Sequence, residues 1–100
     1  MSQFQHDPED KAKYIEKFAP EVKRALMRNK SIRQQTGEEL YQAEGAPGMI
    51  PGEWEVRHDK RMPKDKRYIL TWDNSHLGYF PSLIQASRTI VSVSHDRIFR

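Results

Sequence analysis

Apolar side chains recur at four-residue steps near the start of the chain, and this spacing constrains the fold more than any other feature of the sequence. The stripe consists of Tyr14, Phe18, Val22 and Leu26. Residues four apart lie on one face of an α-helix, and basic residues occupy the other side here. Asp7 is suited to cap this helix and Pro8 to fill its first position, so the sequence predicts a helix that begins near residue 7.

Pro20 lies within this apolar stripe. A proline inside a helix removes one backbone hydrogen bond and clashes with the preceding turn, at a cost of about 3 kcal/mol. The sequence therefore predicts that the N-terminal helical region is broken near Pro20, either as a kink or as two helices that meet near Ala19.

A second, shorter helix is predicted after Thr36. Thr36 and Glu39 have the spacing of a capping box, in which a side chain and the backbone satisfy each other's hydrogen bonds. This helix is expected to end near Gly45, which gives a helical part over residues 7–44. The next segment, residues 45–52, contains three glycines and two prolines and is predicted to be a linker or an ordered crossover rather than a helix or strand.

Two short segments downstream are rich in aromatic and β-branched residues, EWEVRH at residues 53–58 and RYILTW at residues 67–72. The stretch between them is polar and contains a proline, so we expect an antiparallel β-hairpin with a basic loop. Trp54 and Trp72 are expected to face each other across this hairpin as core residues. The following DNSHLG, residues 73–78, is predicted to be a turn.

The last twenty residues, PSLIQASRTIVSVSHDRIFR, allow two interpretations. Ser82 and Gln85 have capping-box spacing, so a helix over residues 82–90 is predicted. Beyond it the chain either restarts as a second helix capped by Ser94 or continues as a β-strand, because TIVSVS is rich in β-branched residues. The strand would pair with the hairpin and enlarge the sheet.

Interpreted as two helices, this region resembles the short helix-turn-helix modules that are appended to homing endonucleases and found in phage proteins. The residues that match the pattern of those modules are Ser82, Leu83, Ala86, Arg88, Ile90, Val93, Ser94, Ile98 and Arg100. The resemblance covers a fifth of the chain. The residues that it implies approach a nucleic-acid groove are Ser94, His95, Arg97 and Arg100.

Composition limits both the core and the classes of function. Of the 100 residues, 36% are hydrophobic and 31% are charged, so much of the chain is expected on a surface or against a partner. The chain has no cysteine, which excludes disulfides, thiolate nucleophiles and cysteine zinc sites. No stretch approaches the apolar length of a membrane span. We therefore expect a cytoplasmic protein without membrane contact.

Charges are grouped in blocks along the chain, whose net charge is +3. Residues 22–37 are basic without an acid, residues 34–56 are acidic without a lysine or arginine, and residues 57–67 are mostly basic. Such blocks build a face for a polyanion, or let the acidic block fold back onto the basic ones. The candidates for contact with phosphates in the third block are Arg57, Lys60, Arg61, Lys64, Lys66 and Arg67.

No set of residues in the sequence has the spacing of a catalytic or metal site. Ser94, His95 and Asp96 are the members of a hydrolase triad, but adjacent side chains diverge in a helix or a strand. The four histidines are scattered, without the close spacing of a helical metal pair. We therefore predict a protein that is not an enzyme and that has no cofactor and no metal site.

These features combine into one prediction of fold and function. The chain is expected to be a single α+β domain over residues 1–100. It consists of N-terminal helices broken near Pro20, a β-hairpin, and a C-terminal helix followed by a second helix or a strand. The hairpin and the C-terminal element together occupy residues 53–100. The protein is predicted to bind DNA or RNA, or a nucleic-acid-processing machine, and a phage-type regulatory factor is one form that such a protein takes. The alternative is an interaction subunit or inhibitor that docks on a larger protein assembly through its acidic residues 38–55 and the crossover.

Overall fold

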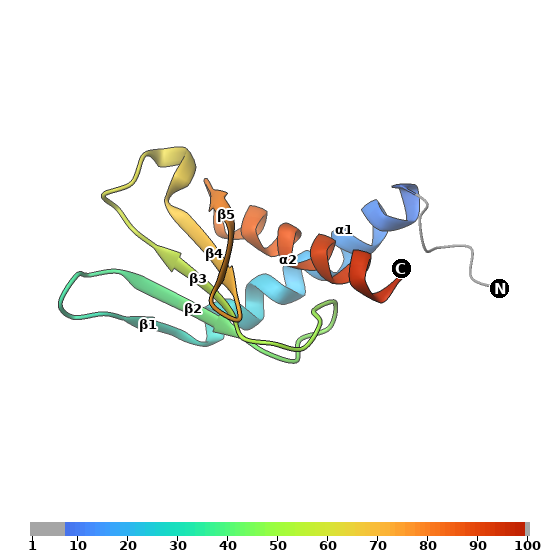
Figure 1. Ribbon diagram of the computed structural model, residues 1–100, viewed down its shortest axis with the longest axis horizontal. Helices are drawn as coiled ribbons and strands as arrows, with labels where there is room; N and C mark the ends of the chain where they lie inside the picture. Colours follow the sequence, from blue (N-terminus) through green and yellow to red (C-terminus); the bar gives the residue numbers. More distant parts are fainter. Residues whose placement is uncertain (1–7, 100) are drawn as a thin grey trace.

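The computed structural model describes residues 8–99 of the chain. These residues form an antiparallel sheet of five strands in chain order, and two helices that lie against each other on one side of it (Figure 1), so the predicted α+β class is confirmed. A short 3-10 turn, η1, precedes the fourth strand. The elements are α1 (Pro8–Arg28), β1 (Lys30–Ile32), β2 (Glu39–Ala43), β3 (Trp54–His58), η1 (Lys64–Lys66), β4 (Tyr68–Trp72), β5 (Ser75–Phe80) and α2 (Leu83–Ile98).

Helix α1 continues through Pro20, so the predicted division into two helices near Ala19 is wrong. Pro20 is exposed, whereas Ala19 and Val22 are buried, so the backbone carbonyl that loses its partner lies on the side where water solvates it. Burial of Val22 and Leu26 stabilises by about 1.5–3 kcal/mol for each side chain, which offsets a proline cost of about 3 kcal/mol. The predicted start of this helix agrees with α1, and its proposed cap, Asp7, lies outside the described residues.

The predicted helix after Thr36 is wrong, because β1 and β2 form a hairpin in this region. The hydroxyl of Thr36 accepts a hydrogen bond from the backbone N–H of Glu38 at 3.2 Å, which closes a turn instead of capping a helix. Along its whole length β2 pairs with β3, and this pairing prevails over a local capping signal. Of the described residues within the helical part predicted over residues 7–44, only Pro8–Arg28 are helical.

The predicted hairpin of β3 and β4 is confirmed. Trp54 and Trp72 are directly opposite in the register, and their rings stack with centroids 5.2 Å apart and planes 15° apart. Trp54 is 1% exposed, while Trp72 is half-buried. Stacked aromatic pairs contribute beyond their buried area, so this pair fixes the register of the central strands.

The turn predicted over residues 73–78 is too long, because only Asp73 and Asn74 form the connection between β4 and β5. Both have positive φ, 49° and 68°, as a tight two-residue hairpin requires, and aspartate and asparagine tolerate that conformation. The chain therefore enters β5 at once, and β5 pairs with β4 through a bulge next to Leu70.

Helix α2 is a single helix, so the prediction of a second helix or a strand after residue 90 is wrong. Its predicted cap is confirmed, since the hydroxyl of Ser82 accepts a hydrogen bond from the backbone N–H of Gln85. Ile90 and Val91 are fully buried in the core, and this packing outweighs the weak β-preference of branched residues. The tight turn of a helix-turn-helix module is accordingly absent from the described residues 83–98.

The crossover at residues 45–52 has no regular structure, as predicted, but it is fixed in place. The N–H of Ile50 donates to the hydroxyl of Ser94 at 3.0 Å, and the carbonyl of Ile50 accepts from the indole of Trp54 at 3.0 Å. Gly52 has a φ of 132°, and a Cβ there would collide with the indole nitrogen of Trp72. The crossover therefore closes one end of the core.

The core fills the space between the helices and one face of the sheet; its largest buried members include Val22, Leu26, Trp54, Val56, Leu70 and Ile90. Side chains alternate along each strand, so every second residue points to the other face. Over that face, which we call the open face, lies no helix of the described chain (Figure 1). By register the open face contains Leu40, Gln42, Glu55, Arg57, Ile69, Thr71, His76 and Tyr79. Neither helix within residues 8–99 combines the length and the apolarity that crossing a bilayer requires.

Candidate nucleic-acid interface

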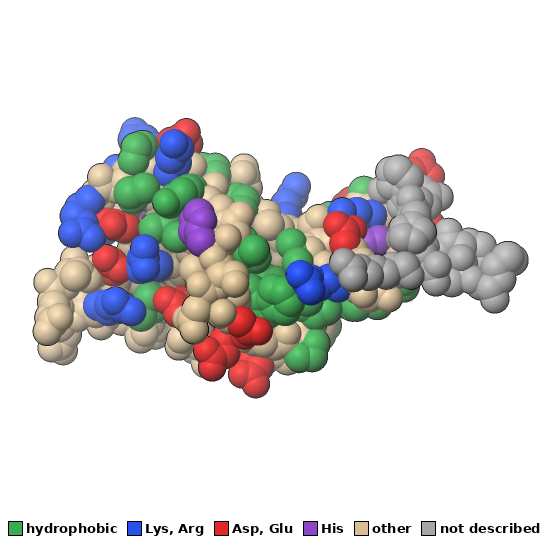
Figure 2. Space-filling view, viewed as in Figure 1, with side chains coloured by type: hydrophobic (Ala, Val, Ile, Leu, Met, Phe, Trp, Pro, Cys, Tyr) green, Lys and Arg blue, Asp and Glu red, His purple; other side chains and the backbone are tan. Residues whose placement is uncertain are grey.

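Two loops extend from the same end of the sheet, the β1–β2 turn at residues 33–38 and the β3–β4 loop at residues 59–67 (Figure 1). Figure 2 shows lysine and arginine side chains gathered over this end of the molecule. We call it the basic end. Its cationic residues are Arg33, Arg57, Lys60, Arg61, Lys64, Lys66 and Arg67.

Two acids of the basic end, Glu38 and Asp59, bind its arginines, whereas Asp65 is exposed between Lys64 and Lys66. Glu38, whose side chain is 10% exposed, lies 3.2 Å from Nε of Arg57 and accepts a hydrogen bond from Arg61 at 3.0 Å. The carboxylate of Asp59 accepts two side-chain hydrogen bonds from Arg61, at 2.9 and 3.0 Å, and one from its backbone N–H. The side-chain hydrogen bond from Arg61, and then the backbone one, lower the pKa of Asp59 to about 2. Arg57 and Arg61 therefore hold the two loops together.

The β3–β4 loop is also ordered by its own backbone. The N–H of Asp59 donates to the carbonyl of Arg67, and the N–H of Met62 donates back to the carbonyl of Asp59. The guanidinium Nε of Arg67 donates to the carbonyl of Met62 at 3.0 Å. These bonds fix the path of the loop, so the side chains that project from it have defined starting positions.

Three lysines of this loop are not used in that network. Lys60, Lys64 and Lys66 are exposed, and none of them forms an ion pair within residues 8–99. An exposed ammonium group on an ordered loop is a point charge that phosphate oxygens can approach from several directions. The lysines, rather than the arginines, are therefore the cations of the predicted cluster that remain open to a ligand.

The neighbouring acid Glu39 is engaged as well. One of its oxygens lies 2.7 Å from the ammonium of Lys30, and the other lies 3.2 Å from Nδ1 of His58. The hydrogen bond from Lys30 lowers the pKa of the Glu39 carboxyl. The first two acidic residues of the block, Glu38 and Glu39, thus bind basic residues.

Two of the predicted nucleic-acid contacts on α2 are buried. Ser94 donates to the carbonyl of Ile90 at 2.8 Å and accepts from the N–H of Ile50, and its side chain has no exposed surface. His95 is 2% exposed, and its ring packs edge-on against Tyr14 at a centroid distance of 5.1 Å. Both side chains are part of the interior, so the prediction that they approach a nucleic-acid groove is corrected.

The third candidate on α2, Arg97, is exposed but lies elsewhere. Its guanidinium is 4.5 Å from the ring centroid of Trp72, at the end of β4 that is remote from the β3–β4 loop (Figure 1). Arg100 lies outside the described residues. The structure thus brings together the six candidates of residues 57–67 and leaves Arg97 apart from them.

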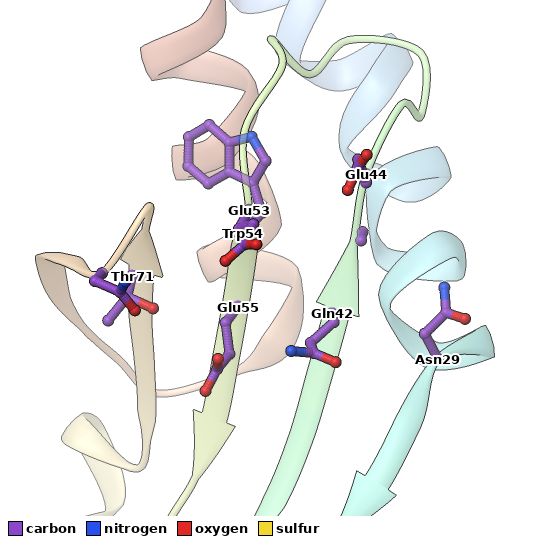
Figure 3. A pocket seen from close by; sticks show the side chains of 9 residues that line it. Asn29, Gln42, Glu44, Glu53, Trp54, Glu55 and Thr71 are labelled. Carbon is purple, nitrogen blue, oxygen red and sulfur yellow. The ribbon is translucent and has the colours of Figure 1, made fainter.

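The other three acids of the block at residues 34–56, Glu44, Glu53 and Glu55, line a pocket at the other end of the sheet. Figure 3 shows Glu44, Glu53 and Glu55 around it, together with side chains from β2, β3 and β4. The pocket has a volume of about 330 Å³. None of its three glutamates forms an ion pair among the residues that the structure describes. We call it the acidic pocket; the surface predicted over residues 38–55 is therefore divided between two ends of the sheet.

Sequence reasoning missed a pair of aromatic residues on the open face, His76 and Tyr79. Their ring centroids are 4.7 Å apart, and both side chains are exposed. His76 was hidden by the prediction of a turn over residues 73–78. The signal that could have found it was Asp73-Asn74, a two-residue turn pair followed directly by a segment that ends in Tyr-Phe.

The basic end and the acidic pocket differ in charge, and neither contains a metal site. No group of three or more histidine, aspartate or glutamate side chains within residues 8–99 is placed to hold a metal ion. Comparisons of the chain with protein-family models, with curated proteins and with solved structures found no match. The geometry of the two charged sites is therefore the observation from which we infer a function.

Proposed function

We propose that the protein binds nucleic acid through its basic end. The observation that carries this proposal is the exposure of Lys60, Lys64 and Lys66 on an ordered loop, without an acid partner in the described chain. Ammonium groups so placed bind phosphates, and the release of counterions from the nucleic acid drives the association. Contacts of this kind position the protein on the nucleic acid without reading its sequence.

The ion pairs of the basic end support the proposal. Glu38 and Asp59 bind Arg61, and this network ties the β1–β2 turn to the β3–β4 loop. A loop that is already ordered loses less conformational entropy when it binds. The acids thereby contribute to binding of a polyanion, although their own charge opposes it.

A fluorescence anisotropy titration of labelled duplex DNA and labelled single-stranded RNA, repeated at several salt concentrations, tests the proposal. The wild-type protein is expected to bind in the micromolar range or tighter at low salt, and to weaken steeply as salt rises. The triple variant Lys60→Glu/Lys64→Glu/Lys66→Glu is expected to bind at least about tenfold more weakly. On a duplex, the slope of log affinity against log salt should fall by about 0.9 for each phosphate that the variant no longer neutralises.

A second triple variant separates the effect of where the charges lie from the effect of net charge on affinity. Lys13, Lys17 and Arg88 are exposed on the helices, and their replacement by glutamate changes the net charge by the same amount. This control is expected to keep most of the affinity. Equal losses in the two variants would remove the basic end from the proposal, and no binding of the wild-type protein at low salt would overturn it. Arg61 is left intact because its loss would disrupt the loop itself.

The acidic pocket favours a second candidate function, docking of a cationic segment of another protein. Glu44, Glu53 and Glu55 surround a hollow of about 330 Å³ and form no ion pair in the described chain. Opposite charge therefore favours a cationic partner. A labelled arginine-rich peptide is the direct probe. Replacing the three glutamates with glutamine is expected to abolish its binding, whereas the lysine variant of the basic end should bind it unchanged. Binding that survives loss of the glutamates would rule this candidate out.

A further inference from the structure

An exposed aromatic pair lies on the open face. Tyr79 is 46% exposed, and its ring centroid is 4.7 Å from that of His76, with 57° between the ring planes. The register places Tyr79 beside Ile69, which is followed across the sheet by Arg57 and Leu40. This row, in which Tyr79 is exposed, Ile69 is buried, and Arg57 and Leu40 are half-buried, crosses the open face with no helix over it in residues 8–99.

This row lies next to the unpaired lysines of the basic end. The turn η1, which contains Lys64 and Lys66, packs against β5, the strand that carries Tyr79. Farther from the basic end, the next row of the open face contains Glu55, whose charge repels phosphates. Charge therefore favours a polyanion over the row of Tyr79 and disfavours one over the row of Glu55.

An exposed aromatic ring beside a cationic groove is the arrangement that proteins use to bind single strands, in which bases stack on the ring and phosphates contact the cations. In a duplex the bases are stacked on one another and paired, so they cannot lie on a flat protein surface without being extruded. The row of Tyr79 offers contacts that only an unpaired base can make.

We infer that the nucleic acid bound at the basic end is single-stranded, and that one of its bases stacks on Tyr79 of the open face. This inference rests on the proposed function and names its ligand class. The phosphates that flank the stacked base face Lys64 and Lys66. Leu40, which is half-buried, extends the apolar surface for a further base or sugar.

Substitution of Tyr79 tests the inference. A labelled oligouridine of about 12 nucleotides and a duplex of the same length are titrated with wild-type protein, Tyr79→Ala and Tyr79→Phe. Tyr79→Ala is expected to bind the single strand roughly 5- to 150-fold more weakly, with duplex binding unchanged. Tyr79→Phe keeps the ring and is expected to bind the single strand as the wild-type protein does.

Leu77→Ala provides a matched control, because Leu77 is an exposed apolar residue of the same strand without an aromatic ring. It is expected to bind oligouridine normally. Chemical-shift changes at the Tyr79 ring on addition of oligouridine give a second readout, which does not depend on the stability of any variant. Their absence, at saturating oligouridine, would overturn the inference.

The outcomes separate this inference from the proposed function. If the lysine variant of the basic end loses binding while Tyr79→Ala retains full affinity for the single strand, phosphate binding stands and stacking on the open face is overturned. Tighter binding of the duplex than of the single strand by wild-type protein would have the same meaning. If wild-type protein binds neither nucleic acid at low salt, both the function and the inference fall.

Discussion

The two halves of the acidic block have opposite surroundings. Glu38 and Glu39 adjoin the basic end and bind cations, whereas the acids of the other half bind none in the described chain and line a pocket. The strand β2 that separates them is five residues long and spans about 15 Å, which exceeds the Debye length at physiological salt. Acidic residues that are close in the sequence therefore form two separate surfaces when a β-strand lies between them.

Neutralising one acid from each half tests this difference and gives the largest expected effect. Glu38→Gln leaves Arg57 and Arg61 without their shared partner and is expected to lower the free energy of unfolding by about 1–3 kcal/mol. Glu55→Gln, in the acidic pocket, is expected to change it by less than about 0.5 kcal/mol. Urea unfolding followed by tryptophan fluorescence measures both. A loss of stability for Glu38→Gln as small as the one expected for Glu55→Gln would mean that the ion pairs of Glu38 contribute no net stability.

The pH dependence of stability extends the comparison to Asp59, which binds Arg61 together with Glu38. Its pKa in the folded protein is about 2, below the usual value of 3.8, so its contribution is complete above 3.8 and is lost as the pH falls through about 2. Asp59→Asn removes this contribution. The difference in melting temperature between wild-type protein and Asp59→Asn is expected to be present near neutral pH and to vanish below about pH 2. A difference that persists there would have to come from packing.

The pair of Lys30 and Glu39 gives the smallest expected effect. Its two side chains are 42% and 23% exposed, so water and salt screen the attraction between them. Lys30→Gln is expected to lower the melting temperature slightly at low ionic strength and not at all in concentrated sodium chloride. Thermal melts at both ionic strengths measure this. A loss that is independent of salt would assign the role of Lys30 to its contact with the ring of Tyr41, whose centroid lies 5.8 Å from the ammonium nitrogen.

The parts of the fold that sequence reasoning predicted are those in which local and tertiary preferences agree. The β3–β4 hairpin has aromatic and β-branched strands, a polar loop, and Trp54 paired with Trp72 in the core. In β2 the two preferences conflict: Thr36 suggests a helix cap, yet Tyr41 and Ala43 are buried in the core, because β2 pairs with its neighbours and packs against α1. Such pairing depends on residues distant in the chain, which a local pattern does not contain.

The candidate site was predictable where its residues are contiguous. Residues 57–67 form one loop, so their basic residues had to lie together once the hairpin formed. That Arg61 binds Glu38, 23 residues away, depends on the register of β2 against β3 and is not encoded locally. Ser94 and His95 were assigned to a binding surface because a turn was expected before them; in one continuous helix they fall on the buried face.

The order in which the strands follow one another has a consequence for folding kinetics. Each strand pairs with its neighbour in the chain, so the sheet forms through short loop closures, whereas α1 and α2 pack together from opposite ends of the chain. Lys11 and Asp96, which are paired across the two helices, are 85 residues apart. Closing so long a loop costs more entropy, so we expect the helices to dock after the rate-limiting step.

Stopped-flow folding of two variants tests this order. Ile90→Val, in the helix layer, is expected to accelerate unfolding and leave the folding rate nearly unchanged, a φ-value near zero. Asn74→Ala, in the β4–β5 turn, is expected to slow folding instead, because its positive φ is needed when the hairpin first closes. The reverse pattern would mean that the two ends of the chain meet before the sheet forms.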